Sequence, residues 1–124
     1  MRYLEWKSRI SLLWVAVAIL TALHMIMVIA EPGAIDDLMA GEIVGMDTSG
    51  PVTITWVLFV LVPLMMAFGT FVLPDEPNRW VNGVLGVIVA GVWALDFAEQ
   101  HEIVGGPLLT ASVIAGSLMI VWHA

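Results

Sequence analysis

The sequence predicts an all-α membrane protein: a four-helix transmembrane bundle of up-down-up-down topology with a short interfacial helix in the first outer loop. Hydrophobic residues make up 60% of the 124 residues and charged residues only 12%, which is far from the average of soluble domains. The apolar residues gather into four long runs, and a membrane span requires about 20 residues. A chain of this length forms one domain at most. We therefore expect residues 1–124 to form a single four-span unit.

Glycine and proline separate the four predicted spans. The spans cover about 8–30, 52–73, 79–101 and 107–123, and the first outer loop covers 31–51. Pro32-Gly33 ends the first run, and Gly105-Gly106-Pro107 forms the last turn. The fourth run has only about 17 residues, which is the short limit for a span.

The first outer loop is acidic and contains one short helical pattern. In 34–40 the apolar residues Ile35, Leu38 and Met39 are grouped, while Asp36 and Asp37 lie on the other side. This pattern predicts an amphipathic helix at the membrane surface, ended by Gly41. The glycines and proline that follow predict irregular structure up to the second span.

Proline also marks the second span and the turn after it. Pro63 lies near the middle of the span, where it removes one backbone hydrogen bond and kinks the helix. Pro63 is therefore a candidate structural hinge, and a packing kink alone is an equal interpretation. The segment 74–77 predicts a tight turn, with Asn78 as the N-cap of the third span.

The charged residues are sorted between the two sides of the predicted bundle. One side carries Arg2, Lys7, Arg9 and Arg79. The other side carries Glu31, Asp36, Asp37, Glu42, Asp47, Asp96, Glu99 and Glu102, and no lysine or arginine. The positive-inside bias places both termini in the cytoplasm of a multi-pass plasma-membrane protein. The net charge of −7, with no basic patch, excludes nucleic acid as a partner.

The third span keeps its polar residues on one face. Asn82, Gly86, Trp93 and Asp96 recur at helical spacing. A membrane helix with one polar face turns that face toward protein or water. We therefore expect this helix to form one wall of whatever the bundle encloses.

Several stretches together resemble one family. They are LLW at 12–14, EPGAIDDLMAGEIVG at 31–45, NRWVN at 78–82 with Gly86, and IVWHA at 120–124. The chain resembles, over nearly its whole length, an uncharacterised family of small four-helix integral membrane proteins of bacteria and archaea. It departs from that pattern at Leu61 and Met25, where many members carry carboxylates. The resemblance implies the fold and topology, and it implies no activity.

Ionisable residues within the spans predict a site in the outer leaflet. An ionisable side chain inside a span costs several kcal/mol unless it is paired or hydrated, and a pair of His24 with Asp96 relieves that cost for both. The candidate ligand-binding residues are Thr21, His24, Trp93, Asp96, Glu99 and His101. They predict an outward-facing acidic pocket for a small polar, cationic or lipid ligand.

Structural interpretations of the same residues stay open. His24 alone is typical of a hydrogen-bonded histidine in a bundle, and Asp96 to Glu102 fit a solvated helix end. The acidic loop also fits adaptation to high salt. The sequence contains no cysteine and no nucleophile-elbow motif. Glu99, His101 and Glu102 also lack the i, i+4 spacing of a helical zinc site. We therefore predict no catalytic residues, no metal and no other cofactor.

Three classes of function remain compatible with the sequence. The first is a ligand-binding or transport-related protein that forms a homo-oligomer, because four helices rarely enclose a transport path. The second is an accessory or structural subunit of a larger membrane complex, which would use the small-residue faces of the last two spans. The third is a membrane enzyme acting on a lipid or quinone headgroup, with His24 and Asp96 as an acid–base pair.

Overall fold

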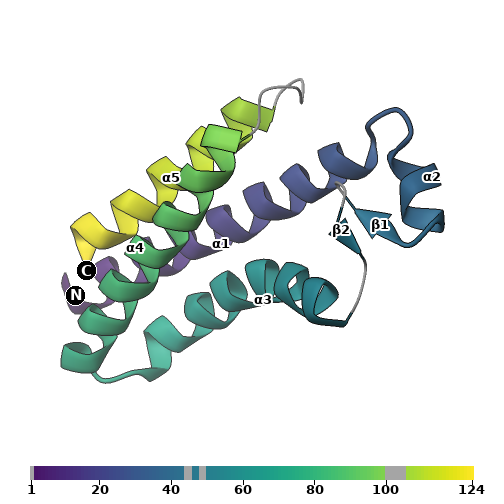
Figure 1. Ribbon diagram of the computed structural model, residues 1–124. Coiled ribbons are helices and arrows are strands. Elements are labelled where there is room, and N and C mark those ends of the chain that lie inside the picture. Colours follow the sequence, from purple (N-terminus) through teal and green to yellow (C-terminus); the bar gives the residue numbers. More distant parts are fainter. Residues whose placement is uncertain (1, 44–45, 48–49, 100–105) are drawn as a thin grey trace.

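The computed structural model describes residues 2–43, 46–47, 50–99 and 106–124, and within these ranges the chain is almost entirely helical (Figure 1). The elements are α1 (Arg2–Ile29), α2 (Ala34–Met39), β1 (Glu42–Ile43), β2 (Met46–Asp47), α3 (Gly50–Val72), α4 (Asp75–Glu99) and α5 (Gly106–His123). The all-α fold class is therefore confirmed.

The helices lie where the sequence predicts spans, but their ends differ. The first helix begins at Arg2 rather than Ser8, because the predicted start counted only the apolar run and the polar residues before it also form helix. The helix of the third predicted span, α4, begins at Asp75 rather than Arg79, since Asp75 and Glu76 suit the positive end of a helix.

Two glycines set the shape of the connection between α1 and α3. Gly33 (φ 89°) comes directly before α2 and Gly41 (φ 87°) follows it, and both have left-handed backbone that favours glycine. The pairing of β1 with β2, in antiparallel register with Glu42 opposite Asp47, was not predicted. Residues of α2 are not buried, and its apolar side chains stand exposed, with Met39 at 83%.

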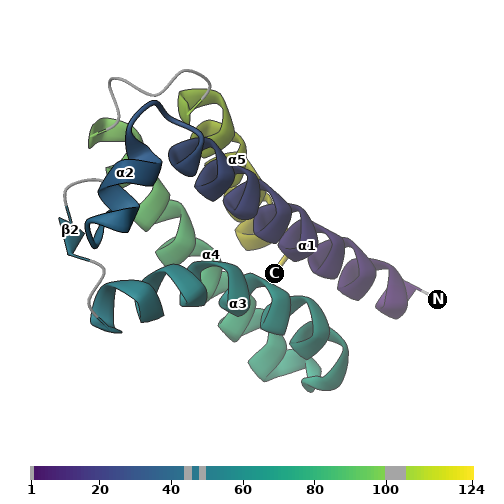
Figure 2. The ribbon, with the colours of Figure 1, turned by 90° about the vertical axis from the view of Figure 1, so that its right-hand side faces the viewer.

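The helices pack in an order that differs from their order in the chain. α1 packs against both α3 and α5, and α5 packs in turn against α4. The consecutive helices α3 and α4 make few contacts, because they diverge from their shared turn (Figures 1 and 2). Adjacency in the chain therefore does not make α3 and α4 close packing neighbours. Both chain termini lie at one end of the molecule (Figure 1).

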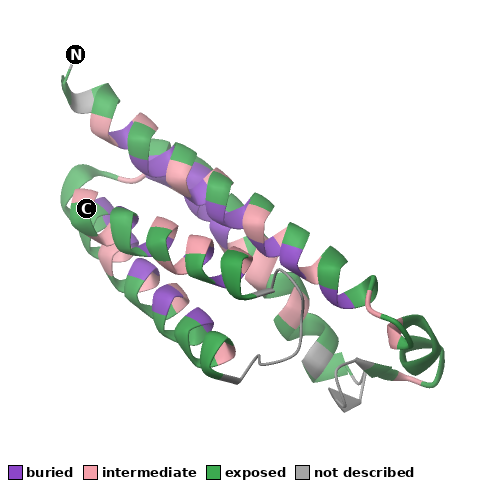
Figure 3. Cartoon of the chain, turned by 90° about the horizontal axis from the view of Figure 1, so that it is seen from above, coloured by how far each residue is buried: buried purple, intermediate pink, exposed green. Residues whose placement is uncertain are grey.

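The core runs along α1, where buried positions recur at each turn (Figure 3). The buried hydrophobic cluster consists of Ile10, Trp14, Val17, Met66, Ala67, Trp93, Val113 and Ile120. α4 and α5 approach closely at Gly86, where an added Cβ would lie 2.8 Å from Val121 Cγ2 and 3.2 Å from the Ser117 carbonyl oxygen. Small residues permit such backbone approach between apolar helices.

Three helices are long and apolar enough, by length and composition, to cross a membrane. They are Leu4–Ile29, Thr53–Val72 and Asp75–Ala98, and Pro107–His123 is a shorter apolar helix. Many large apolar side chains on these helices are exposed, among them Phe68 at 74% and Trp80 at 74%. Exposed apolar surface on this scale is unusual for a soluble monomer and suits a lipid environment.

A buried hydrogen-bond network joins α1 to the α3–α4 turn. Trp14 Nε1 donates to Asn82 Oδ1 at 2.6 Å, and Thr70 Oγ1 reaches the same oxygen at 3.3 Å. Asn82 Nδ2 donates to the Asn78 carbonyl at 2.8 Å. Asn78 Nδ2 donates to the Thr70 carbonyl at 2.6 Å. Asn78 therefore caps the carboxyl end of α3 rather than the amino end of α4, and its predicted N-cap role is wrong.

Two further contacts from α1 strengthen the same junction. Lys7 Nζ donates to the Leu73 carbonyl at 3.0 Å and lies 3.3 Å from Asp75 Oδ1. Ser11 Oγ donates to the Ala67 carbonyl at 2.8 Å. The Leu73 carbonyl lies just past the end of α3 and has no partner within that helix, so Lys7 satisfies it. Together with the Ser11 bond, this contact ties α1 to the last turns of α3. Hydrogen bonds thus link α1, α3 and α4 near the turn between α3 and α4. Away from this turn, α3 and α4 diverge (Figures 1 and 2).

Candidate ligand-binding site

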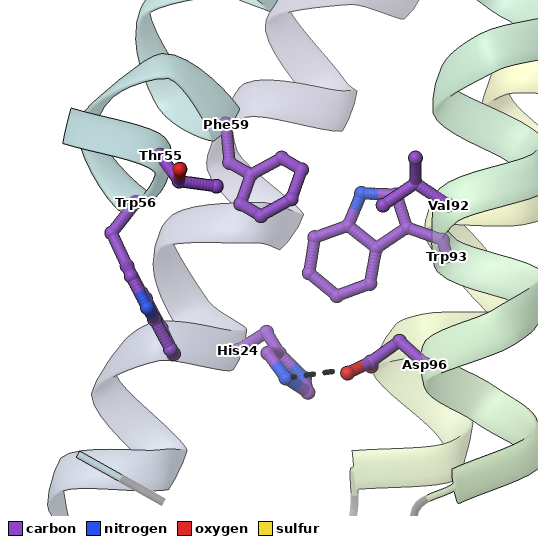
Figure 4. Close-up of a pocket in the computed structure, with 7 residues that line it drawn as sticks. All are labelled: His24, Thr55, Trp56, Phe59, Val92, Trp93 and Asp96. Atoms are coloured by element: carbon purple, nitrogen blue, oxygen red, sulfur yellow. Dashed lines mark ion pairs between the residues drawn. The ribbon is translucent and has the colours of Figure 1, made fainter. Parts of the chain in front are cut away.

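The divergence of α3 and α4 leaves a cavity whose floor is α1. Its volume is about 330 Å³. Its walls are His24 from α1, Thr55, Trp56 and Phe59 from α3, and Val92, Trp93 and Asp96 from α4 (Figure 4). A volume of this size is at the small end of the range for ligand sites in proteins.

His24 is the buried ionisable group of the cavity. Only 3% of the residue is exposed. Its Nε2 lies 3.8 Å from Asp96 Oδ2 (Figure 4), and its ring stands edge-on to Trp93 at 4.9 Å between centroids and 85° between planes. The carboxylate therefore compensates any positive charge on the imidazole, and the indole fixes the orientation of the ring.

Asp96 connects this buried group with the open side of the cavity. Its side chain is 36% exposed, against 4% for that of His24. It lies three residues before Glu99, the end of α4, which is about 5 Å along the helix axis. The carboxylate is thus accessible from the end of the bundle that carries the acidic loop.

Aromatic side chains form most of the remaining wall. Phe59 and Trp93 approach to 6.0 Å between centroids at an angle of 47°. Trp56 lies on the α3 side of His24, opposite Asp96 (Figure 4). Aromatic faces attract cations through the ring quadrupole, so a carboxylate framed by aromatic rings is suited to a cation with apolar substituents.

The predicted site residues fall into two groups. His24, Trp93 and Asp96 meet at the cavity. Thr21 is fully buried on α1, does not line the cavity, and its Oγ1 has no hydrogen-bond partner among the described residues. The side chain of Glu99, and all of His101 and Glu102, lie outside the described residues.

Sequence reasoning did not identify the α3 wall. Thr55, Trp56 and Phe59 occupy neighbouring positions on one side of the helix, at spacings of one, three and four residues. Two aromatic residues one turn apart in the outer half of a span are a usable signal, but aromatic residues near a span end are also typical interface anchors. The sequence alone does not separate the two.

Pro63 lies one turn beyond Phe59 in a helix that continues through it. It is fully buried, and α3 is helical from Gly50 to Val72. Because proline lacks an N–H, the Phe59 carbonyl loses the hydrogen bond that residue 63 would otherwise donate. The proposed hinge thus lies at the base of the cavity wall, and its movement stays a prediction.

The described part of the chain contains no group of three or more His, Asp or Glu side chains placed to hold a metal ion. The cavity has one histidine and one carboxylate, which suit electrostatic binding of an organic ligand. Comparison with protein-family models, with curated proteins and with solved structures found no match for this chain.

Proposed function

We propose that this chain is a four-span membrane protein that binds a small organic cation in the cavity of His24 and Asp96. Insertion is supported by the three long apolar helices and by α5, whose 18 residues extend about 27 Å. The single observation that carries the ligand assignment is an accessible carboxylate, Asp96, beside an aromatic-lined cavity.

The charge distribution supports both the topology and the ligand charge. Lysine and arginine occur at the end where both termini lie, which the positive-inside bias assigns to the cytoplasm. The opposite end carries the acidic loop and Asp96. A surface of negative sign raises the local concentration of cations and speeds their association. The proposed cavity therefore opens to the outside.

The proposed resemblance to small four-helix membrane proteins agrees with this topology and adds no ligand. Transport across the membrane would additionally require assembly of several copies, since one cavity at the outer end provides no path through the bundle. We therefore propose binding as the basic function, with any transport carried out by a homo-oligomer.

Isothermal titration calorimetry of the detergent-purified protein tests the proposed ligand. Benzyltrimethylammonium serves as the probe and benzyl alcohol as its neutral counterpart. We expect the cation to bind at least tenfold more tightly, which corresponds to about 1.4 kcal/mol. The Asp96→Asn variant should lose that preference, because the amide keeps the shape of the carboxylate without its charge.

Asp36→Asn is the matched control, since Asp36 lies on the exposed helix α2 in the same acidic region and not in the cavity. Its affinity for the cation should stay within about twofold of that of the native chain. Equal binding of the cation and the alcohol, or full affinity in Asp96→Asn, would refute the proposal. A protein partner retained in mild detergent would then favour an accessory-subunit role.

A further inference from the structure

A second concave surface lies on α4 and α5, at the end of the molecule opposite the cavity. It is a groove of about 520 Å³, and Arg79, Trp80, Gly83, Val87 and Val121 are among its lining residues. None of the groove residues lines the cavity of His24 and Asp96. The ligand proposed for that cavity therefore leaves this groove unexplained.

Two glycines on neighbouring faces of α4 create the groove. At Gly86 the backbone of α4 approaches α5 so closely that a Cβ would meet Val121 at 2.8 Å. One turn earlier, a Cβ on Gly83 would meet nothing within 4 Å. The two helices are thus in contact at the bottom of a trough whose walls are valine and isoleucine side chains. A trough of this kind accommodates an extended hydrocarbon chain.

A positively charged side chain, Arg79, lies at one end of the groove. Arg79 is exposed, and its guanidinium lies 5.5 Å from the ring centroid of Trp6. Within the described ranges no carboxylate pairs with Arg79, whereas Lys7, at the same end of the bundle, pairs with Asp75. A guanidinium presents several N–H donors that match the oxygens of a phosphate.

The polar and apolar parts of the groove lie at the right depths for one lipid molecule. Arg79 and Trp80 are in the first turns of α4, at the end that carries the basic residues. From Arg79 to Ile88 the groove extends about 14 Å along the helix axis. Trp80, 74% exposed, is a side chain of the type that lies at the headgroup level of a bilayer.

We infer that this groove binds one glycerophospholipid with an anionic headgroup from the cytoplasmic leaflet. The phosphate pairs with Arg79, and one acyl chain lies between α4 and α5 over Gly83. The inference rests on the proposed membrane insertion and is independent of the ligand proposed for the His24–Asp96 cavity. Charge complementarity favours an anionic lipid over a second copy of the chain, because a copy inserted in the same orientation would bring its own basic end, with Arg2, Lys7, Arg9 and Arg79, beside the groove.

Native mass spectrometry of the protein released from mixed vesicles tests the inference. The vesicles contain equal amounts of phosphatidylglycerol and phosphatidylcholine. We expect one phosphatidylglycerol molecule to be retained in at least fivefold preference over phosphatidylcholine. Arg79→Gln should remove this preference. Arg9→Gln changes an exposed arginine of α1 at the same end and should preserve it.

Gly83→Leu tests the acyl chain, because the new side chain fills the groove without meeting any atom near its Cβ. It should abolish retention of both lipids. Gly69→Leu places the same side chain on α3, where the nearest atom to the new Cβ is Leu73 Cδ1 at 4.0 Å, and should retain the lipid. Circular dichroism and elution volume verify that all variants fold, and only folded variants are compared.

Three results would overturn the inference. They are equal retention of the two lipids by the native chain, unchanged preference in Arg79→Gln, and a lipid-free homodimer whose interface covers the groove. Glycerol 3-phosphate supplies the headgroup phosphate without acyl chains and should not be retained. Its retention would show an anion site in place of a lipid groove. These outcomes do not depend on whether benzyltrimethylammonium binds in the His24–Asp96 cavity. Either proposal can therefore be refuted while the other stands.

Discussion

Asn82 connects three helical segments through a single side-chain amide. Its oxygen accepts hydrogen bonds from Trp14 on α1 and Thr70 on α3, and its nitrogen donates to the carbonyl of Asn78. All four residues are buried. A polar group buried among apolar helices is stabilising only while its partners remain, because an unpaired donor loses its hydrogen bond without regaining water.

We expect Asn82→Leu to lower the free energy of unfolding by about 1–2 kcal/mol, since it leaves the Trp14 indole N–H without an acceptor. Denaturation in mixed micelles measures the change. Ser112→Ala is the control, because Ser112 Oγ bonds only within its own helix, to the Leu108 carbonyl. A loss in Ser112→Ala as large as that in Asn82→Leu would argue against a joining role for Asn82.

The absence of a side chain at Gly86 allows α4 and α5 to touch. Gly86→Ala would introduce a methyl group 2.8 Å from Val121, and we expect it to cost about 1–3 kcal/mol through overpacking. Gly91→Ala, at an open position on the same helix, should cause no loss. Unfolding midpoints in mixed micelles compare the two, and equal effects would show that the close approach is not required.

Among the elements, α1 has the largest structural role. It supplies a buried face along its length and packs against both α3 and α5. Lys7 and Ser11 donate hydrogen bonds from the first three turns of α1 to carbonyls in and just after the last turns of α3. Toward the other end of α3 the two helices α3 and α4 diverge, and the cavity lies between them (Figure 1).

This arrangement makes α3 the element that would move when a ligand binds. Pro63 weakens the helix between its fastened end and the cavity wall. We expect Pro63→Ala to slow both association and dissociation of benzyltrimethylammonium several-fold. The alanine restores the helical hydrogen bond and stiffens α3, and a stiffer hinge slows the movement that lets the ligand enter and leave. Stopped-flow tryptophan fluorescence provides both rates, since Trp56 and Trp93 line the cavity.

Pro51→Ala is the control for the hinge. Pro51 is in the first turn of α3, where proline is compatible with a helix and no hydrogen bond is lost. Its rates should match those of the native chain. Unchanged rates in Pro63→Ala would assign Pro63 to packing alone.

For the whole molecule, the sorting of charges predicts how the proposed membrane-spanning bundle is oriented. The chain contains no cysteine, so single cysteines can be introduced as topology probes. A membrane-impermeant maleimide should label Asp36→Cys in intact cells and Glu76→Cys only after permeabilisation. Both positions are exposed. The reverse pattern would invert the proposed orientation, and labelling of both in intact cells would exclude an odd number of spans between them.

The helices were predictable because their signals are local. Each long helix contains an apolar run, and glycine or proline marks most of the breaks between runs. The pairing of residues 42–43 with 46–47 was missed, since two-residue strands leave no periodic pattern to detect.

The candidate site was predictable only in part, for a related reason. Ionisable residues in an apolar run are conspicuous, so His24 and Asp96 were identified from sequence along with Trp93 on the same face as Asp96. In the sequence, Trp56 and Phe59 cannot be distinguished from aromatic residues that anchor a span at the membrane interface. Their role as cavity walls is visible only once the packing of α3 against α1 is known. Asn78 suited an N-cap by residue type, and its actual role as a cap for the preceding helix depends on a tertiary contact.

The pattern of apolar residues along the chain was therefore sufficient to predict the helical class and the positions of the long helices. The positions of the charged residues gave the charge asymmetry between the helix ends. The neighbours of each helix depend instead on complementary surfaces from distant segments, such as Gly86 against Val121 and Trp14 against Asn82. Those contacts separate α3 from α4 and bring α1 beneath the gap. The cavity exists because of that packing, and a single stretch of sequence does not encode it.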